Sequence, residues 1–305
     1  MAKVFFITGA SKGFGRHWAE TALQRGDRVA ATARNPDDLQ ALTAEFGEAV
    51  LPLRLDVTDR EQCFAAVQQA HEHFGRIDVL ISNAGYGHFG FVEEITEQEA
   101  RAQLETNVFG SLWVIQAVLP FMRTQLSGHH QVSASVASAS ESQDLSCVKW
   151  AVEGLCESLS KRKSRASAFM SPSSEPPFTT DWAQVSSVRS QQLPEYAQVR
   201  EGFVANTKTF DRGNPAATGD ALMQLVDMDH PPLRLMLGRM AWKVIEPAYN
   251  ERLQTWREWL ELAECAVRAV ARQLRYRGIH DNRVDPIGSD QHPVTHQMAF
   301  RSSVW

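Results

Sequence analysis

Residues 3–122 alternate between short apolar runs and segments with helical periodicity, and this alternation restricts the fold more than any other feature of the sequence. Continuous apolar runs are typical of parallel strands that are buried on both faces. Helices between such strands form right-handed crossovers and cover both faces of the sheet. The strand-like runs are KVFFIT (3–8), RVAATA (28–33), VLPLRLDVTD (50–59) and IDVLISNAG (77–85), and the helix-like segments cover 16–26, 36–46, 60–75 and 97–122. The pattern predicts an α/β fold with a doubly wound parallel sheet.

A glycine-rich turn follows the first of these strands. The sequence GASKGFG (9–15) stands between KVFFIT and a helical segment. Gly9 permits a tight turn, and Gly13 and Gly15 allow the backbone to approach a ligand closely. The N-terminus of the helix that follows favours a phosphate group. In this context the turn predicts a dinucleotide site, and the alternative is a glycine-rich turn that binds nothing.

Composition narrows the class of protein. Hydrophobic residues make up 43% and charged residues 22%, which is ordinary for a globular chain. The net charge of −5 argues against nucleic acid as a partner. The four cysteines have neither metal-ligand nor disulfide spacing, and the apolar N-terminal run is too short for a signal peptide or a membrane span. We expect a cytoplasmic protein that does not bind a membrane.

Four motifs give the chain a specific resemblance. The stretches TGASKGFG (8–15), LDVTD (55–59), NAG (83–85) and TNVFG (106–110) resemble the short-chain dehydrogenase/reductase family at its usual spacing. Within that family the chain is similar to the NADP-dependent ketone and alcohol oxidoreductases. The resemblance implies a Rossmann fold in a single domain with a small C-terminal substrate lid. It also implies hydride transfer between NADP(H) and a small carbonyl or alcohol substrate.

The resemblance further implies roles for individual residues. The turn at Ser11 to Phe14 would hold phosphates, Asp56 and Val57 would flank the adenine, and Asn107 would kink its helix and hold a water of a proton relay. An ordinary buried asparagine is the alternative for Asn107. The residues expected to contact the cofactor are Gly9, Ser11, Lys12, Gly13, Phe14, Gly15, Arg34, Asp56, Val57, Asn83, Ala84, Gly85, Lys149 and Thr180.

The end of the second strand argues for NADP(H) over NAD(H). An acidic residue usually binds the ribose 2′-hydroxyl at this point. Here the sequence reads Thr32-Ala33-Arg34, and no carboxylate follows until Asp37. Arg34 and Lys12 suit a 2′-phosphate, although either could be a solvated surface charge.

The catalytic part of the resemblance is incomplete. In the family a serine polarises the carbonyl, a tyrosine transfers the proton, and a lysine four residues later lowers the tyrosine pKa. KWAVEGLCESL (149–159) matches the helix that carries this lysine, so Lys149 takes its place. Four residues earlier stands Leu145, which has no exchangeable proton. Ala134 occupies the position of the catalytic serine and leaves Ser133 as a substitute.

A second departure lies at 161–177, which is basic and rich in serine. No strand periodicity is visible there, although the family has a buried strand at this point. Codons can be chosen for 134–148 and 161–176 that restore family-like sequence in another reading frame. A frameshift, from sequencing error or gene decay, would therefore explain both departures, and the alternative is a real but altered protein. The resemblance resumes at FTTDWA (178–183), where Thr180 matches a residue that contacts the nicotinamide amide.

The remaining third is less informative. Residues 189–238 resemble the family's substrate lid, last helix and last strand, with an edge strand at PLRLMLG (232–238). An amphipathic helix over 248–274 carries tryptophans that would pack or dimerise, so a homo-oligomer is possible. We expect domains at 1–190, 191–265 and 266–305, the last a disordered tail, and no metal site.

Two functions remain open from the sequence. The first is a short-chain oxidoreductase, impaired because the catalytic tyrosine and serine are absent, in which Asn107, Ser133 and Lys149 remain of the catalytic set. The second is a non-catalytic NADP-binding protein, either a regulator or a partner in a hetero-oligomer.

Overall fold

The computed structural model describes residues 2–135, 147–160, 165–171, 187–207, 213–237 and 239–265. Residues 1–251 form one compact unit and residues 252–305 a second. Thr180, Leu145 and the predicted tail lie outside the described residues, and the predicted domain limits remain a prediction. Of the helices that the structure describes, none combines the length and the apolar character needed to cross a membrane.

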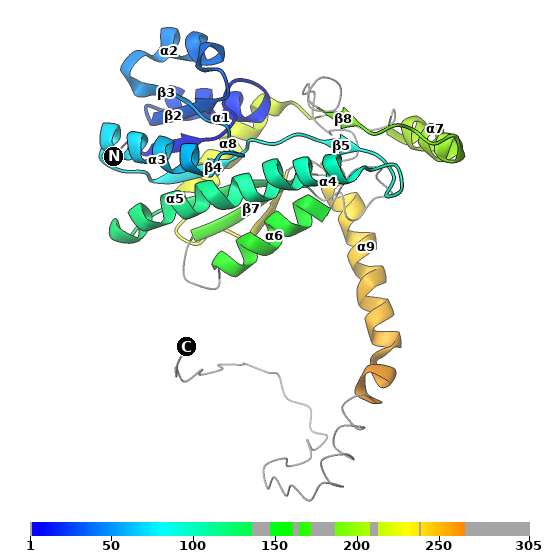
Figure 1. Ribbon diagram of the computed structural model, residues 1–305. Coiled ribbons are helices and arrows are strands. Elements are labelled where there is room, and N and C mark those ends of the chain that lie inside the picture. The colour runs from blue at the N-terminus through cyan, green and yellow to red at the C-terminus, as the bar shows by residue number, and fades with distance from the viewer. Residues whose placement is uncertain are drawn as a thin grey trace, which may run out of the picture. The chain divides into compact units, whose positions relative to one another are not determined.

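A parallel sheet of seven strands runs through the first unit (Figure 1). The chain builds outward from β1 to β3, then returns to the other side of β1 with β4 and continues outward to β9. This order confirms the doubly wound sheet. In spatial order the strands are β3 (Val50–Arg54), β2 (Arg28–Ala33), β1 (Val4–Ile7), β4 (Val79–Ser82), β6 (His129–Ser135), β7 (Arg165–Ser171) and β9 (Arg234–Met236).

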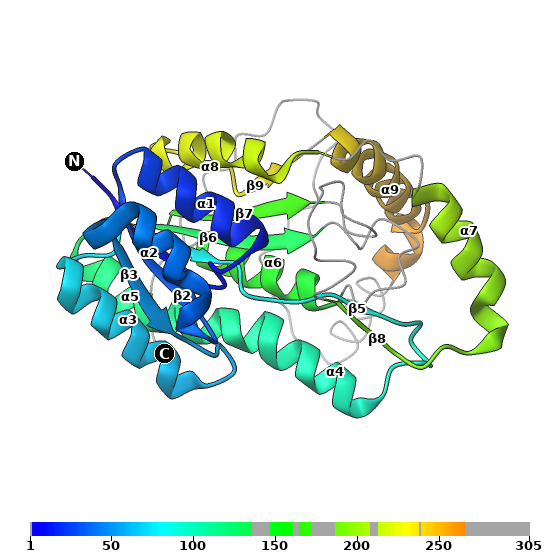
Figure 2. The ribbon, with the colours of Figure 1, turned by 90° about the horizontal axis from the view of Figure 1, so that it is seen from above.

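Helices cover both faces of this sheet. Helices α1 and α8 run side by side, as do α3 and α5 (Figure 2). The α-helices are α1 (Gly13–Gln24), α2 (Gln40–Phe46), α3 (Arg60–Phe74), α4 (Glu97–Leu104), α5 (Gly110–Thr124), α6 (Cys147–Ser160), α7 (Ala197–Thr207), α8 (Thr218–Asp227) and α9 (Arg239–Glu258). Short 3-10 turns lie at Pro36–Leu39, Gly47–Ala49, Pro194–Tyr196 and Pro215–Ala217.

The central strand β1 explains why an uninterrupted apolar run is needed. Val4 and Phe6 belong to the core beneath α3, α5 and α6, whereas Phe5 and Ile7 belong to the core beneath α1, α2 and α8. All four side chains are fully buried. A strand buried on both faces has no position for a polar side chain, so the sequence VFFI is apolar throughout.

The segment 161–177 contains a strand that the sequence analysis did not predict. β7 pairs in parallel with β6 on one side and with β9 on the other. The strand therefore forms despite the basic and serine-rich surroundings. The expectation of no strand was wrong because sheet pairing outweighs weak local propensity.

The predicted helix over 97–122 is present but is not one α-helix. α4 ends at Leu104, a π-helical turn covers Glu105–Phe109, and α5 begins at Gly110. π-helical turns inside helices are rare and frequently occur at functional sites. The expected departure from regular helix at Asn107 is therefore found.

The predicted edge strand at 232–238 is confirmed as β9, at the end of the sheet order. A second, two-stranded sheet was not predicted. It pairs β5 (His88–Phe89) in parallel with β8 (Val188–Arg189) and so joins the segment after β4 to the segment before α7.

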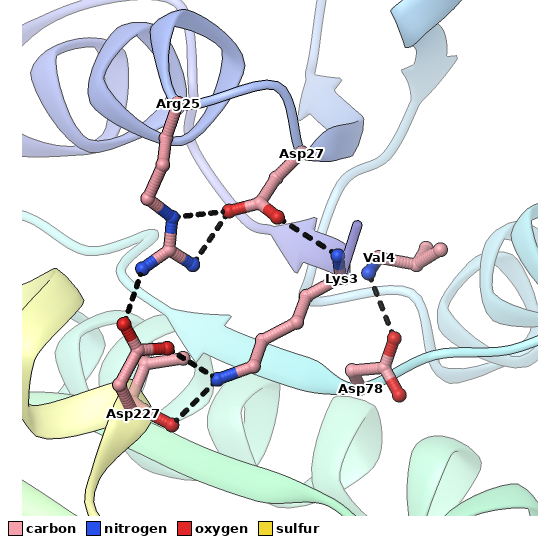
Figure 3. A network of polar contacts seen from close by, with 7 residues as sticks. Lys3, Val4, Arg25, Asp27, Asp78 and Asp227 are labelled. Carbon is pink, nitrogen blue, oxygen red and sulfur yellow. Dashed lines mark hydrogen bonds and ion pairs between the residues drawn. The ribbon is translucent and has the colours of Figure 1, made fainter. Parts of the chain in front are cut away.

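A network of polar contacts ties the beginning of β1 to the end of α8 (Figure 3). Lys3 Nζ donates to Val226 O and to Asp227, and the Arg25 guanidinium bridges Asp227 and Asp27. The Lys3 backbone N–H donates to Asp27 Oδ1 at 2.8 Å. These contacts lie at the N-terminal end of the sheet and so leave its C-terminal edge to the site.

Candidate cofactor and catalytic site

The glycine turn begins directly after β1, where the winding of the sheet reverses. Gly9 has φ +66° and Gly13 has φ +59°, a backbone conformation that side chains disfavour. The Ala10 N–H donates to Thr32 O at 2.9 Å and fastens the turn to the end of β2. This edge, at a reversal of strand order, is where open α/β sheets bind ligands.

Gly15 has a different role, because it lets the first turn of α1 lie close to the glycine loop and to Asn83. A Cβ on Gly15 would overlap Gly9 O and would lie 2.5 Å from Asn83 Nδ2. The first turn of α1 can therefore lie against the glycine loop and the end of β4 only with glycine at this position. α1 begins at Gly13, and the N–H groups of a first helical turn have no intrahelical acceptor. They are the donors that a pyrophosphate group uses.

Thr8 and Asn83 lock the ends of β1 and β4 together. Thr8 Oγ1 accepts the N–H groups of Asn83 and Ala84, both at 2.9 Å. Asn83 Nδ2 in return donates to Thr8 O at 3.0 Å and to Gly9 O at 3.1 Å. Thr8 is not among the predicted site residues, although a threonine between a buried strand and a glycine turn is the signal that could have identified it.

Asn107, in the π-helical turn, binds the backbone of Tyr86. Asn107 Oδ1 accepts the Tyr86 N–H at 3.1 Å, and Asn107 Nδ2 donates to Tyr86 O at 2.9 Å. Asn107 is 2% exposed. Its side chain therefore holds the loop that follows Asn83, and its own backbone carbonyl accepts Ser111 Oγ at 3.0 Å.

The predicted adenine side lies at the ends of β2 and β3. Asp56 Oδ1 accepts both donors of Thr58, and Val57 is buried against Gly110, where a Cβ would lie 2.7 Å from Val57 Cγ2. Arg34 and Lys12 are both exposed. Their charges are therefore accessible to a ligand at this end of the site.

Lys149 is half-buried on α6. Val148 and Val152 of the same helix are buried, and α6 packs against β6, β7 and the π-helical turn. Lys149 and Asn107 therefore stand on elements that touch. Ser133 belongs to β6, in register with Phe169 of β7, and its side chain is not among those described.

Burial keeps the thiols of Cys63 and Cys156 and the phenol of Tyr86 in their neutral forms at neutral pH. Burial raises the pKa of the Cys63 and Cys156 thiols to about 12, so neither is a thiolate nucleophile. Burial also raises the pKa of the Tyr86 phenol. Among the described residues, no cluster of side chains has the composition of a metal site.

The fold and the glycine turn together define the class of dinucleotide-binding α/β proteins. The sequence pattern of the short chain dehydrogenase family matches residues 3–167, which is more than half of the chain. The chain belongs to this family and is an oxidoreductase of the type that transfers a hydride with a nicotinamide cofactor.

Individual proteins support the same assignment. The chain is 36% identical to oxidoreductase BOA17 of Botryotinia fuckeliana over 271 residues, which cover 86% of this chain and 98% of that protein. A short-chain dehydrogenase from Streptomyces avermitilis has a TM-score of 0.78 at 30% identity, over 87% of this chain and 98% of the other. An alcohol dehydrogenase from Thermococcus sibiricus, solved with 5-hydroxy-NADP, has a TM-score of 0.63 at 25% identity, over 78% and 96%.

Proposed function

We propose that the chain binds NADP(H) at the C-terminal edge of its sheet and acts on a carbonyl or alcohol substrate. The interlocked glycine turn supports this most strongly, because Gly15 leaves no room for a side chain beside Gly9 and Asn83. The turn would hold the pyrophosphate, and the cofactor would supply or accept the hydride.

Preference for NADP(H) is proposed from charge. Arg34 and Lys12 are exposed at the end of β2 and the start of α1, and no carboxylate stands there before Asp37. Guanidinium and ammonium groups favour a 2′-phosphate, whereas a ribose 2′-hydroxyl is usually bound by a carboxylate. The relative from Thermococcus sibiricus, solved with 5-hydroxy-NADP, agrees with this proposal.

Arg34→Ala tests the charge argument. We expect NADPH affinity to fall by about tenfold or more, as for loss of one charge-assisted contact, and NADH affinity to stay within about twofold. The control is Arg101→Ala, because Arg101 is an exposed arginine that pairs with Glu97. Titration of cofactor fluorescence measures both constants. An equal loss of affinity for NADPH and NADH would show that Arg34 does not bind the 2′-phosphate.

We propose that proton transfer is impaired in this chain. Lys149 would keep the role of the relay lysine, Asn107 would hold the relay water, and Ser133 would stand in for the serine. Leu145 can neither donate nor accept the proton. Loss of a general acid lowers rates by about 10²–10⁴-fold.

Restoring the missing groups tests this proposal. The double substitution Leu145→Tyr with Ala134→Ser should raise turnover of a panel of ketones by about 10²–10⁴-fold. Lys149→Met in that background should abolish the gain. If the unaltered chain already turns over at the rate of the double variant, impairment is wrong. A reading of the coding DNA across codons 128–180 tests the frameshift directly.

The second candidate is a non-catalytic NADP-binding protein. Leu145 supports it, because a leucine at this position removes the proton donor and leaves the predicted cofactor-binding residues in place. Such a protein would bind NADPH tightly and show no turnover even after the double substitution. Binding and rate therefore separate the two functions.

A further inference from the structure

We propose that Gln103 is a positioning residue that, together with Asn107, sets the Gly85–Tyr86 peptide at the catalytic half of the cofactor site. This inference rests on the proposed NADP(H) site. Gln103 lies on α4, one helical turn before Asn107, and is 2% exposed. Residues four positions apart point to the same side of a helix.

The two amides converge on one carbonyl group. Gln103 Nε2 donates to Tyr86 O at 3.0 Å, and Asn107 Nδ2 donates to the same oxygen at 2.9 Å. Asn107 Oδ1 also accepts the Tyr86 N–H. Both polar groups of the Tyr86 backbone are thus held by side chains of one helical segment, and the carbonyl is held twice.

The neighbouring glycine makes this arrangement tight. A Cβ on Gly85 would overlap Asn107 Oδ1. The loop backbone therefore touches the amide that holds it, and a shift of the Tyr86 peptide would move Gly85. Because the preceding residues Asn83 and Ala84 are fixed to Thr8, the position of the loop is set from both sides.

The side-chain oxygen of Gln103 indicates that stability alone does not explain this residue. Within the described part of the chain, Gln103 Oε1 is buried and has no hydrogen-bond partner. A buried oxygen without a partner costs free energy that an apolar side chain of similar size would avoid. Gln103 thus forms one hydrogen bond, to Tyr86 O, and leaves its own side-chain carbonyl without a hydrogen-bond donor. We infer that fixing the loop, and not packing, is what the amide contributes.

The location decides which half of the cofactor is affected. α6, which carries Lys149, packs against the π-helical turn that contains Asn107. The predicted adenine residues Asp56 and Val57 follow β3, on the other side of β1. The Gly85–Tyr86 peptide thus belongs to the catalytic half, where the nicotinamide would lie.

The test compares a whole cofactor with its adenine half. Gln103→Met keeps the length and burial of the side chain and removes both the donor and the unpaired oxygen. We expect NADPH affinity to fall by about three- to twelvefold, as for loss of one ordering hydrogen bond. Affinity for adenosine 2′,5′-bisphosphate should stay within about twofold. The thermal midpoint should stay within about 2 °C, because the unpaired oxygen is removed together with the bond.

The matched control is Gln68→Met, since Gln68 is an exposed glutamine whose amide pairs with Glu72 on α3. It should change neither affinity. Gln103→Asn, which shortens the reach of the amide by one carbon, serves if the methionine variant does not fold.

The outcomes separate this inference from the proposed function. If both ligands bind the unaltered chain and Gln103→Met weakens both equally or neither, the positioning role is wrong and the NADP(H) site stands. A lower thermal midpoint with equal loss of both ligands would indicate a structural role. If the unaltered chain binds neither ligand, the proposed function fails and this inference fails with it.

Discussion

At the scale of single residues, the site depends on glycines at positions where a side chain would overlap neighbouring atoms. Gly15 and Gly154 illustrate the contrast, because both are glycines within helices. A Cβ on Gly15 would overlap the backbone oxygen of Gly9, whereas a Cβ on Gly154, which is exposed on α6, would meet nothing within 4 Å. The same substitution should therefore have opposite effects at the two positions.

Gly15→Ala should lower the free energy of unfolding by about 1–3 kcal/mol, the usual cost of overpacking, and should abolish detectable NADPH binding. Gly154→Ala should raise the free energy of unfolding by about 0.5–1 kcal/mol, since alanine favours a helix interior, and should leave binding unchanged. Urea unfolding and cofactor titration measure both. Tight NADPH binding by Gly15→Ala would contradict the assigned role of this turn.

Residues of the candidate site were predictable where the local backbone demanded them. Gly9 and Gly13 have positive φ, and Asn107 stands at the break in its helix, so each carries a local signal. Gln103 carries no such signal, because its partner lies 17 residues away in the chain, and the local signal at Thr8 does not name its partners, which lie 73 or more residues away. Their roles follow only from which elements the fold brings together.

At the scale of elements, the segment before α7 is fastened to the loop after β5. Glu94 Oε1 accepts the Leu193 N–H at 2.8 Å and the Arg200 guanidinium at 2.5 Å, and Glu94 Oε2 accepts the Phe91 N–H at 2.9 Å. The Tyr196 ring stacks on Phe91 at 4.0 Å between centroids. These contacts anchor the predicted substrate lid at its base.

A second anchor lies at the two-stranded sheet. Ser190 Oγ lies 2.8 Å from His88 Nε2 and donates to Glu99 Oε2 at 3.1 Å. Glu99 also forms a capping box with Thr96 at the start of α4. The helix that carries Gln103 is thus connected to the base of the lid.

The Glu94 anchor should weaken in acid. Burial acts to raise the pKa of Glu94, but the bonds from Leu193, Phe91 and Arg200 outweigh it, and the net pKa is lowered. A lowered folded-state pKa means that the stabilisation is complete above the unfolded-state pKa. It is then lost as pH falls through the folded value, which lies below the ordinary glutamate pKa.

Amide exchange at Leu193, corrected for intrinsic rates, measures this anchor between about pH 3.5 and pH 7, a range that reaches below the ordinary glutamate pKa. In the unaltered chain protection should fall toward the acid end. Glu94→Gln should exchange at least about tenfold faster at neutral pH, since the charge-assisted bonds are lost. The control Glu97→Gln, which alters an exposed carboxylate on α4, should not differ from the unaltered chain. Equal protection in Glu94→Gln would show that the charge of Glu94 is not needed.

At the scale of the whole molecule, the network around Lys3 joins residues more than 200 positions apart. Asp27 is buried and holds both the Lys3 N–H and the Arg25 guanidinium, whereas Asp227 is half exposed and pairs with the two cations (Figure 3). The buried carboxylate should therefore matter more to global stability than the exposed one.

Asp27→Ala should lower the free energy of unfolding by about 1.5–3 kcal/mol, because the Lys3 N–H and the Arg25 guanidinium lose a buried, charged acceptor. Asp227→Ala should cost at most about 1 kcal/mol, and this effect should shrink in about 0.5 M salt, because salt screens ion pairs at the surface. Urea unfolding at low and high salt measures both. If Asp227→Ala lowered the free energy of unfolding more than Asp27→Ala does, the exposed carboxylate would be the more important of the two.

Asp227 should also make stability depend on pH. Burial acts to raise its pKa, but Lys3 and Arg25 outweigh that effect and the net pKa is lowered. Its contribution is therefore present above the ordinary aspartate pKa and is lost as pH falls through the folded value.

The sequence by itself determined the class of fold and the position of the glycine turn. Apolar periodicity reports burial on both faces of a strand, and a positive φ favours glycine because side chains disfavour that conformation, so both are local properties. The tertiary structure alone decided the strand β7, the amides on Tyr86 and the anchors of the lid. Each of these depends on which distant segment lies alongside, because hydrogen bonds between neighbouring strands and buried polar pairs form only after the order of the sheet is set.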